Sequence, residues 1–202
     1  MAKRLNIHPT HPEPRKILEV VDVLRRGGVI AYPTDTVYAL GCDIRQKKAV
    51  DEVYRLKRMS KEHPVAFVCP DLGDLARFAT VDDQTYRLMR RLLPGPYTFI
   101  LPATREVPKI LMMKRKTVGI RVPHHEVVLA IVRELGGPIV STSAAFEGEQ
   151  LNDPDDIMLR FKEADLVIDS GWGSLEPSTV LDLSDGKVQV VREGAGPVDG
   201  LI

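Results

Sequence analysis

The sequence has no excess of either charge sign and no long apolar run, and each absence excludes a class of protein. The 28 Lys and Arg residues are balanced by 28 Asp and Glu, so the formal net charge is zero. Proteins that coat nucleic acid are usually strongly basic, although a neutral protein can still carry a local basic cleft. No apolar stretch has the length of a membrane span, and no apolar core follows the basic N-terminal residues as in a signal peptide.

Cysteines and several familiar motifs are also scarce. Cys42 and Cys69 are the two cysteines, each in or beside an apolar run. We expect both thiols to be reduced and buried, in a cytoplasmic protein that does not contact a membrane. Two cysteines are too few for a zinc site, and we predict no protein-held metal and no tightly bound cofactor. The phosphate-loop and dinucleotide glycine motifs are missing, as is the nucleophile elbow, so Ser141 and Ser143 are not obvious nucleophiles.

Helical and strand patterns alternate along the whole chain, without repeats or charged linkers. The predicted helices are residues 14–26, 48–58, two segments opened by Asp71 and Asp82, 126–135 and 155–162. The predicted strands are residues 29–32, 64–69, 97–101, 117–122, 139–143, 166–169, and a hairpin of 179–183 with 187–192. Because a hairpin excludes a purely parallel sheet, we predict an α/β (α+β) fold with a mixed sheet. The 202 residues fit a single domain spanning residues 1–202.

The first candidate site segment runs from Tyr32 to Tyr38. Pro33 ends strand pairing, and Thr34 and Thr36 then point to the same side of an extended chain. Their hydroxyls could therefore bind one ligand, and we assign Thr34, Thr36 and Tyr38 to substrate binding. The alternative is a Pro-Thr-Asp turn that caps a helix.

A basic group forms the second candidate. Arg55, Lys57, Arg58 and Lys61 lie near the end of a predicted helix, where cations also complement the helix dipole. The group is therefore either a solvated helix end or a phosphate site. We assign Lys57 and Arg58 to catalysis and Lys57 also to nucleotide binding.

Arg121 lies between apolar residues on a predicted inner strand, where a guanidinium needs an anionic partner. That partner is either a ligand or an acidic side chain of the protein. The remaining candidates follow or flank other strands, where open sheets commonly bind ligands. They are Ser141, Ser143, Ser178, Thr179 and Arg192.

Three histidines invite other interpretations. His124 and His125 are adjacent, so their side chains point apart in an extended segment, and no third metal ligand lies at helical spacing. We expect them to begin the next helix. His63 is a single loop residue, for which a surface or structural role is the default.

Taken together, these segments resemble the YrdC-like family. The similarity begins with the run from Gly27 to Gly41 and spans nearly the whole chain. The further matching motifs are Leu93-Pro94-Gly95-Pro96-Tyr97-Thr98, Gly119-Ile120-Arg121-Val122-Pro123, Ser141-Thr142-Ser143, Ser178-Thr179-Val180 and Arg192-Glu193-Gly194.

The resemblance implies a twisted mixed sheet with flanking helices and a concave, positively lined cavity. Well-known family members are threonylcarbamoyl-AMP synthases, which join threonine, bicarbonate and ATP, release pyrophosphate and feed a tRNA modification. By position, Thr34 and Arg121 would hold threonine, with Arg121 on its carboxylate. Lys57, Ser143 and Arg192 would hold ATP or AMP, and Mg²⁺ would arrive with the nucleotide.

Two departures set the chain apart from the synthases. Their Lys-x-Arg motif reads Lys57-Arg58-Met59 here, and their Ser-x-Asn motif reads Ser143-Ala144-Ala145. This pattern resembles the YciO branch of the family. We therefore expect any synthase activity to be weak or altered, with Arg58 partly replacing the missing arginine.

The competing function is non-catalytic binding of double-stranded RNA or tRNA. Its candidate phosphate contacts are Arg87, Arg90, Arg91, Lys109, Lys114, Arg115 and Lys116. The zero net charge and the 5% aromatic content weigh against it.

Overall fold

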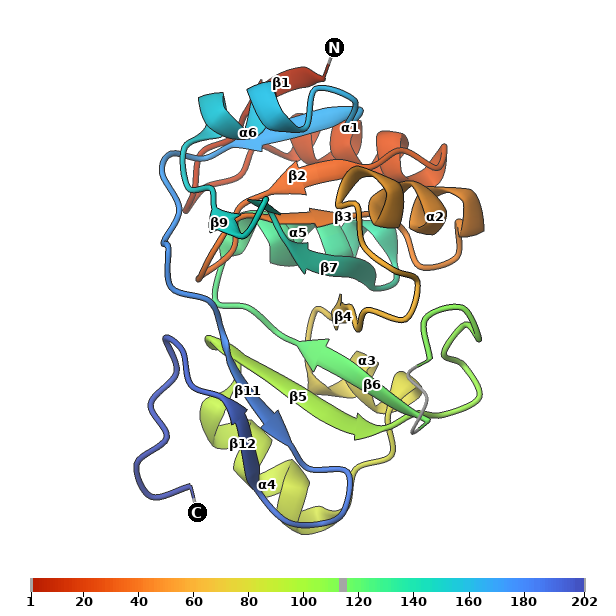
Figure 1. Ribbon diagram of the computed structural model, residues 1–202, viewed down its shortest axis with the longest axis vertical. Coiled ribbons are helices and arrows are strands. Elements are labelled where there is room, and N and C mark those ends of the chain that lie inside the picture. The colour runs from red at the N-terminus through yellow and green to blue at the C-terminus, as the bar shows by residue number, and fades with distance from the viewer. Residues whose placement is uncertain (1, 113–115, 202) are drawn as a thin grey trace.

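The computed structural model describes residues 2–112 and 116–201, and these form a large mixed sheet with helices packed on it (Figure 1). The strand order is β1-β10-β2-β3-β7-β4-β6-β5-β11-β12. The strands are β1 (Lys3–Asn6), β2 (Ile30–Tyr32), β3 (Ala39–Gly41), β4 (Ala66–Val68), β5 (Tyr97–Pro102), β6 (Thr117–Arg121), β7 (Ile139–Ser143), β10 (Leu166–Asp169), β11 (Thr179–Asp182) and β12 (Gln189–Arg192). β8 (Ala145–Phe146) and β9 (Glu149–Gln150) form a separate small hairpin.

The predicted mixed sheet is confirmed by the strand directions. β7 pairs antiparallel with β3 on one side and with β4 on the other. β4 pairs parallel with β6, and β5 pairs parallel with β11. β7 therefore joins the half of the sheet that contains β3 to the half that contains β4, and its side chains lie at this junction.

Six helices are found among the described residues. They are α1 (Pro14–Arg25), α2 (Lys47–Leu56), α3 (Leu72–Phe78), α4 (Asp83–Leu92), α5 (Glu126–Leu135) and α6 (Pro154–Arg160). The predicted caps are confirmed, since the Asp71 and Asp82 side chains accept hydrogen bonds from the first turns of α3 and α4. His125 is the residue before α5, as expected.

The apolar core forms two clusters on opposite faces of the sheet. Neighbouring residues of one strand belong to different clusters, as Ile139 and Val140 do, because successive side chains of a strand point to opposite faces. The cluster containing Ile139 is covered by α1 and α5. Cys42 and Cys69 are buried and unpaired, as predicted, and burial raises the pKa of both thiols. None of the described helices has the length and apolarity to cross a membrane.

Three features differ from the prediction. β1 is polar and largely exposed, so it lacks the apolar alternation that marks a strand. β3, β8 and β9 were not predicted, because strands of two or three residues are too short to show the alternation of apolar and polar residues. α2 ends at Leu56 rather than at residue 58, because Arg58 adopts φ +53°, a left-handed conformation that stops an α-helix.

Candidate functional site

A cavity of about 520 Å³ lies over the junction of the two sheet halves. Its lining comprises Val37, Ala39, residues 63–66, Thr98, Ile100, Gly119, Arg121, residues 141–143, Pro177, Ser178, Val180, Val191 and Arg192. These described lining residues include two guanidinium groups and no carboxylate, so the cavity favours an anionic ligand.

Arg121 is a buried cation with an incomplete set of partners. Its side chain is 7% exposed, and its terminal nitrogen donates to Asp35 Oδ1 and Thr36 Oγ1, both at 2.9 Å. Its Nε has no hydrogen-bond partner among the described residues. Desolvation lowers the pKa of Arg121, and the negative charge of Asp35 opposes that effect. The structural ion pair considered from the sequence is therefore present, and it leaves part of the guanidinium available to a ligand.

Arg192 is held on the other side of the cavity. Its Nε and one terminal nitrogen donate to the Ser178 carbonyl at 3.1 and 2.7 Å, and the same terminal nitrogen lies 3.2 Å from Ser178 Oγ. Ser178 Oγ also lies 2.9 Å from Thr98 Oγ1. Burial, followed by repulsion from Arg121, lowers the pKa of Arg192. The positive charges of the two arginines therefore repel each other across the cavity that both residues line. A bound anion would offset this repulsion.

Hydroxyl groups also line the cavity. Ser141, Thr142 and Ser143 are consecutive on β7, and all three line the cavity. Five residues predicted from the sequence thus lie together in one lining. They are Arg121, Ser141, Ser143, Ser178 and Arg192.

Four of the residues predicted to bind substrate lie outside the lining. Thr34 Oγ1 donates to the Val37 carbonyl at 2.8 Å and accepts from the Thr36 amide, so its donor is used inside a turn. Thr36 reaches the site through Arg121. The Tyr38 hydroxyl donates to the Gly171 carbonyl at 2.7 Å, and Thr179 Oγ1 donates to the Gly196 carbonyl at 2.6 Å. The turn following Pro33 leads into β3, and not into the helix considered as an alternative.

A profile of the Sua5_yciO_yrdC family, described as "Telomere recombination", matches residues 22–194. The chain belongs to this family. Its sequence is 43% identical to the uncharacterized YciO protein of Escherichia coli over 202 residues, which cover 98% of each chain. The crystal structure of E. coli YciO matches with a TM-score of 0.96 at 41% identity, over the full length of both chains. Both the YrdC-like fold and the YciO branch are thereby confirmed.

Relatives with a stated activity or ligand are more distant. A threonylcarbamoyl-AMP synthase of Thiobacillus denitrificans is 38% identical over 168 residues, covering 82% of this chain and 89% of that protein. The crystal structure of P. abyssi Sua5 complexed with L-threonine matches with a TM-score of 0.92 at 26% identity. That match covers 100% of this chain and 62% of the Sua5 chain.

The Lys57-Arg58-Met59 segment departs from the helical geometry predicted for it. Lys57 is half-buried and lies outside the lining, and its ammonium donates to the Ala145 carbonyl, two residues after Ser143. Burial lowers the pKa of Lys57 to about 8. Arg58 turns away: its guanidinium lies 5.3 Å from the centre of the Phe146 ring and 3.3 Å from Glu147 Oε1. With a side chain 73% exposed, Arg58 does not replace the arginine that the family motif has at Met59.

Met59 and Ala145 are apolar residues that lie beside the end of β7, outside the lining. Met59 packs against the core, and its sulfur lies 3.8 Å from Thr142 Oγ1. The Ala145 carbonyl is already bonded to Lys57, and its methyl side chain offers no donor. The two departures seen in the sequence therefore sit beside the hydroxyls of β7.

The other members of the basic group are surface residues. Arg55 pairs with Glu52 and Glu163, and Lys61 pairs with Asp51. The solvated helix end considered from the sequence is therefore correct for Arg55 and Lys61. Among the described lining residues with an ionisable side chain, His63 is the one that was not predicted to belong to the site, and it lies in the loop before β4 with Pro64 and Val65. A lone loop histidine carries no signal in a single sequence, and only the fold brings it to the cavity.

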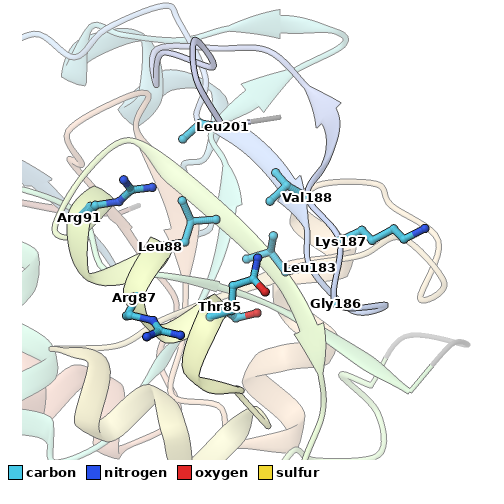
Figure 2. Close-up of a pocket in the computed structure, with 10 residues that line it drawn as sticks. Thr85, Arg87, Leu88, Arg91, Leu183, Gly186, Lys187, Val188 and Leu201 are labelled. Atoms are coloured by element: carbon cyan, nitrogen blue, oxygen red, sulfur yellow. The ribbon is translucent and has the colours of Figure 1, made fainter.

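A second groove of about 400 Å³ lies between α4 and the β11–β12 hairpin (Figure 2). Arg87 and Arg91 lie on its α4 side and Lys187 on its hairpin side, with Leu88 and Leu183 between them. Within residues 2–112 and 116–201 these three cations form no ion pair. The RNA candidates Lys114 and Arg115 lie outside the described residues.

Proposed function

We propose that the cavity binds an adenine nucleotide together with a threonine-like amino acid, for chemistry related to threonylcarbamoyl-AMP synthesis. The observation that carries the proposal is the Nε of Arg121, a buried donor without a partner among the described residues, in a side chain that lines a cavity shared with Arg192. A buried polar group usually has a partner, so a bound anion would complete this one. The relatives named for this synthesis and for an L-threonine complex support the choice of ligands.

The two cations would divide the ligands between them. The amino-acid carboxylate would accept from Arg121, whose other side stays fixed by Asp35 and Thr36. The phosphates would lie toward Arg192 and Ser143, with Lys57 contributing charge from its place beside Ala145. In this arrangement the residues position the reactants and stabilise negative charge as pyrophosphate leaves.

Bicarbonate would supply the carbamoyl carbon of the product. Magnesium would be held by the triphosphate oxygens, because the lining residues present no carboxylate to coordinate it. Its contribution there would be to neutralise phosphate charge.

Calorimetry with ATP, Mg²⁺ and threonine tests the proposal directly. The wild-type chain should bind both ligands, and Arg121→Lys should bind threonine at least tenfold more weakly, about the worth of one charge-assisted contact. Arg45→Lys is the matched control, because Arg45 also pairs with an aspartate but lies outside the cavity lining. If Arg121→Lys loses thermal stability yet binds threonine normally, Arg121 is structural and the proposal is wrong.

A second candidate function, binding of double-stranded RNA or tRNA, is supported by the second groove. Arg87 and Arg91 lie one helical turn apart on α4 and have no acidic partner among the described residues. Unpaired cations in a row on one helix face are typical of phosphate-backbone contacts.

A further inference from the structure

We propose that His63 binds the nucleotide phosphates in its protonated form, so that nucleotide affinity depends on pH. This inference rests on the proposed function and adds a residue to that site. Among the described lining residues the ionisable side chains are those of Arg121, Arg192 and His63. Arginine stays charged at all ordinary pH values, whereas histidine commonly changes charge between pH 5 and 8.

The backbone fixes where His63 sits. Its amide donates to the Ser60 carbonyl at 2.9 Å, and its carbonyl accepts from the Tyr54 hydroxyl at 3.1 Å. Pro64 further restricts the residue before it to extended conformations. The imidazole is therefore carried on an anchored segment of the lining.

The register of the sheet brings His63 to the proposed phosphate end of the cavity. β4 pairs antiparallel with β7, with Ala66 opposite Ser141. Continuing that register by two residues places Pro64 opposite Ser143, and both residues line the cavity. His63 therefore lies next to the end of β7 that carries Ser143, the residue assigned to the nucleotide.

The charges around His63 favour an anion at this position. Arg192 and Arg121 share the lining, and Lys57 is bonded to the Ala145 carbonyl, two residues after the lining residue Ser143. The nearby Lys61 is paired with Asp51, Arg58 is paired with Glu147 and the adjacent Glu62 has a partner of its own. A phosphate is thus the group that both the cations and a protonated imidazole would attract. Since Arg58 points away and Met59 is apolar, a protonated His63 would add a cationic donor to the hydroxyl groups of the lining.

Calorimetric titration with ATP and Mg²⁺ at pH 6 and pH 8 tests the proposal, using His63→Gln, His63→Arg and a control, His11→Gln. His11 is exposed in the N-terminal loop and does not line the cavity. Comparing each variant with wild type at each pH cancels the titration of ATP itself. His63→Gln should bind about tenfold more weakly than wild type at pH 6 and nearly equally at pH 8. His63→Arg should bind tightly at both pH values, and His11→Gln should match wild type.

Three results would overturn the inference. Equal affinity of wild type and His63→Gln at both pH values would show that His63 does not contact the nucleotide. An equal loss at both pH values would show that a neutral ring contacts it, for example by stacking on the base. Absence of any ATP binding by the wild-type chain would overturn the proposed function together with this inference, whereas the first two results leave the proposed function standing.

Discussion

At the scale of single residues, Lys57 has an environment unlike that of an ordinary surface lysine. Its ammonium is half-buried and bonded to a backbone carbonyl, and it pairs with no carboxylate of the described residues. Because burial penalises the charged form, the fold lowers the pKa of Lys57 to about 8. A bound phosphate would restore the charged form, so this residue links nucleotide binding to proton uptake.

Lys57→Met should stabilise the empty protein below pH 8, and the gain should shrink as the pH rises toward the ordinary value for lysine. In that window the unfolded chain binds more protons than the folded chain, so wild-type stability rises with pH. The expected change in the variant's advantage is of the order of 1 kcal/mol after allowance for partial exposure. Urea unfolding of both proteins at pH 7 and pH 10 measures it, and any pH-independent cost of the substitution cancels. An advantage that stays constant with pH would contradict the assignment.

Some residue roles were accessible from the sequence and others were not. Arg121 could be singled out because a guanidinium between apolar strand residues must have a partner. Thr34 and Tyr38 could not be placed, because their side-chain hydrogen bonds go to carbonyls at residues 37 and 171. Which backbone carbonyl accepts a hydrogen bond from a given hydroxyl depends on the path of the loops in the folded protein. No residue pattern in a single sequence predicts that path.

At the scale of elements, the end of α2 and the β8–β9 hairpin form one unit beside the cavity. Lys57 bonds the hairpin at Ala145, and Phe146 lies between the guanidinium groups of Arg58 and Arg160, each 5.3 Å from its ring centre. This unit carries both departures from the synthase motifs. Only the helix of this unit was predicted, because its apolar residues recur with the period of a helix. The strands β8 and β9 have two residues each, which is too short for a recognisable pattern.

The double change Met59→Arg with Ala145→Asn should raise pyrophosphate release in the presence of ATP, threonine and bicarbonate. Each new side chain would offer donors to charge that develops during the reaction, so we expect a gain of about tenfold or more. The two gains should not be additive, because both side chains would contact one nucleotide. Steady-state pyrophosphate assays of the two single variants and the double variant measure this.

Two outcomes would contradict that expectation. Wild-type turnover equal to that of a family member with both motifs intact would show that another residue already serves in their place. Tighter ATP binding without faster turnover in the double variant would show that this branch acts on a different substrate.

At the scale of the whole molecule, overall neutrality conceals an uneven distribution of charge. The net charge is zero, yet the described residues that line the cavity and the second groove include cations and no acidic side chain. Composition predicted the class of protein, and the order of helices and strands predicted the mixed sheet. The strand order, which gathers seven distant segments around one cavity, depends on long-range pairing and was not predicted. The family resemblance implied only the concave cavity itself.

If the second groove binds nucleic acid, Arg87→Ala with Arg91→Ala should weaken binding of double-stranded RNA and flatten its salt dependence. The slope of log affinity against log salt concentration should decrease by about one for each lost phosphate contact. Arg133→Ala, an exposed arginine of α5, is the control. Fluorescence anisotropy over a range of salt concentrations measures the slopes, and an unchanged slope in the double variant would exclude this groove as the RNA site.

The strand order also has a mechanical consequence. β1 and β12, the first and last strands of the chain, are the two opposite edges of the sheet, and the chain ends lie at opposite ends of the molecule (Figure 1). A tension applied through the termini would therefore pass through every strand ladder in series, and the weakest ladder would break first. A ligand that contacts β7, β6 and β12 together would cross-link these strands, and would share the tension with the hydrogen-bond ladders between them. Its presence would raise the rupture force of that half and move the first break to the strands between β1 and β7.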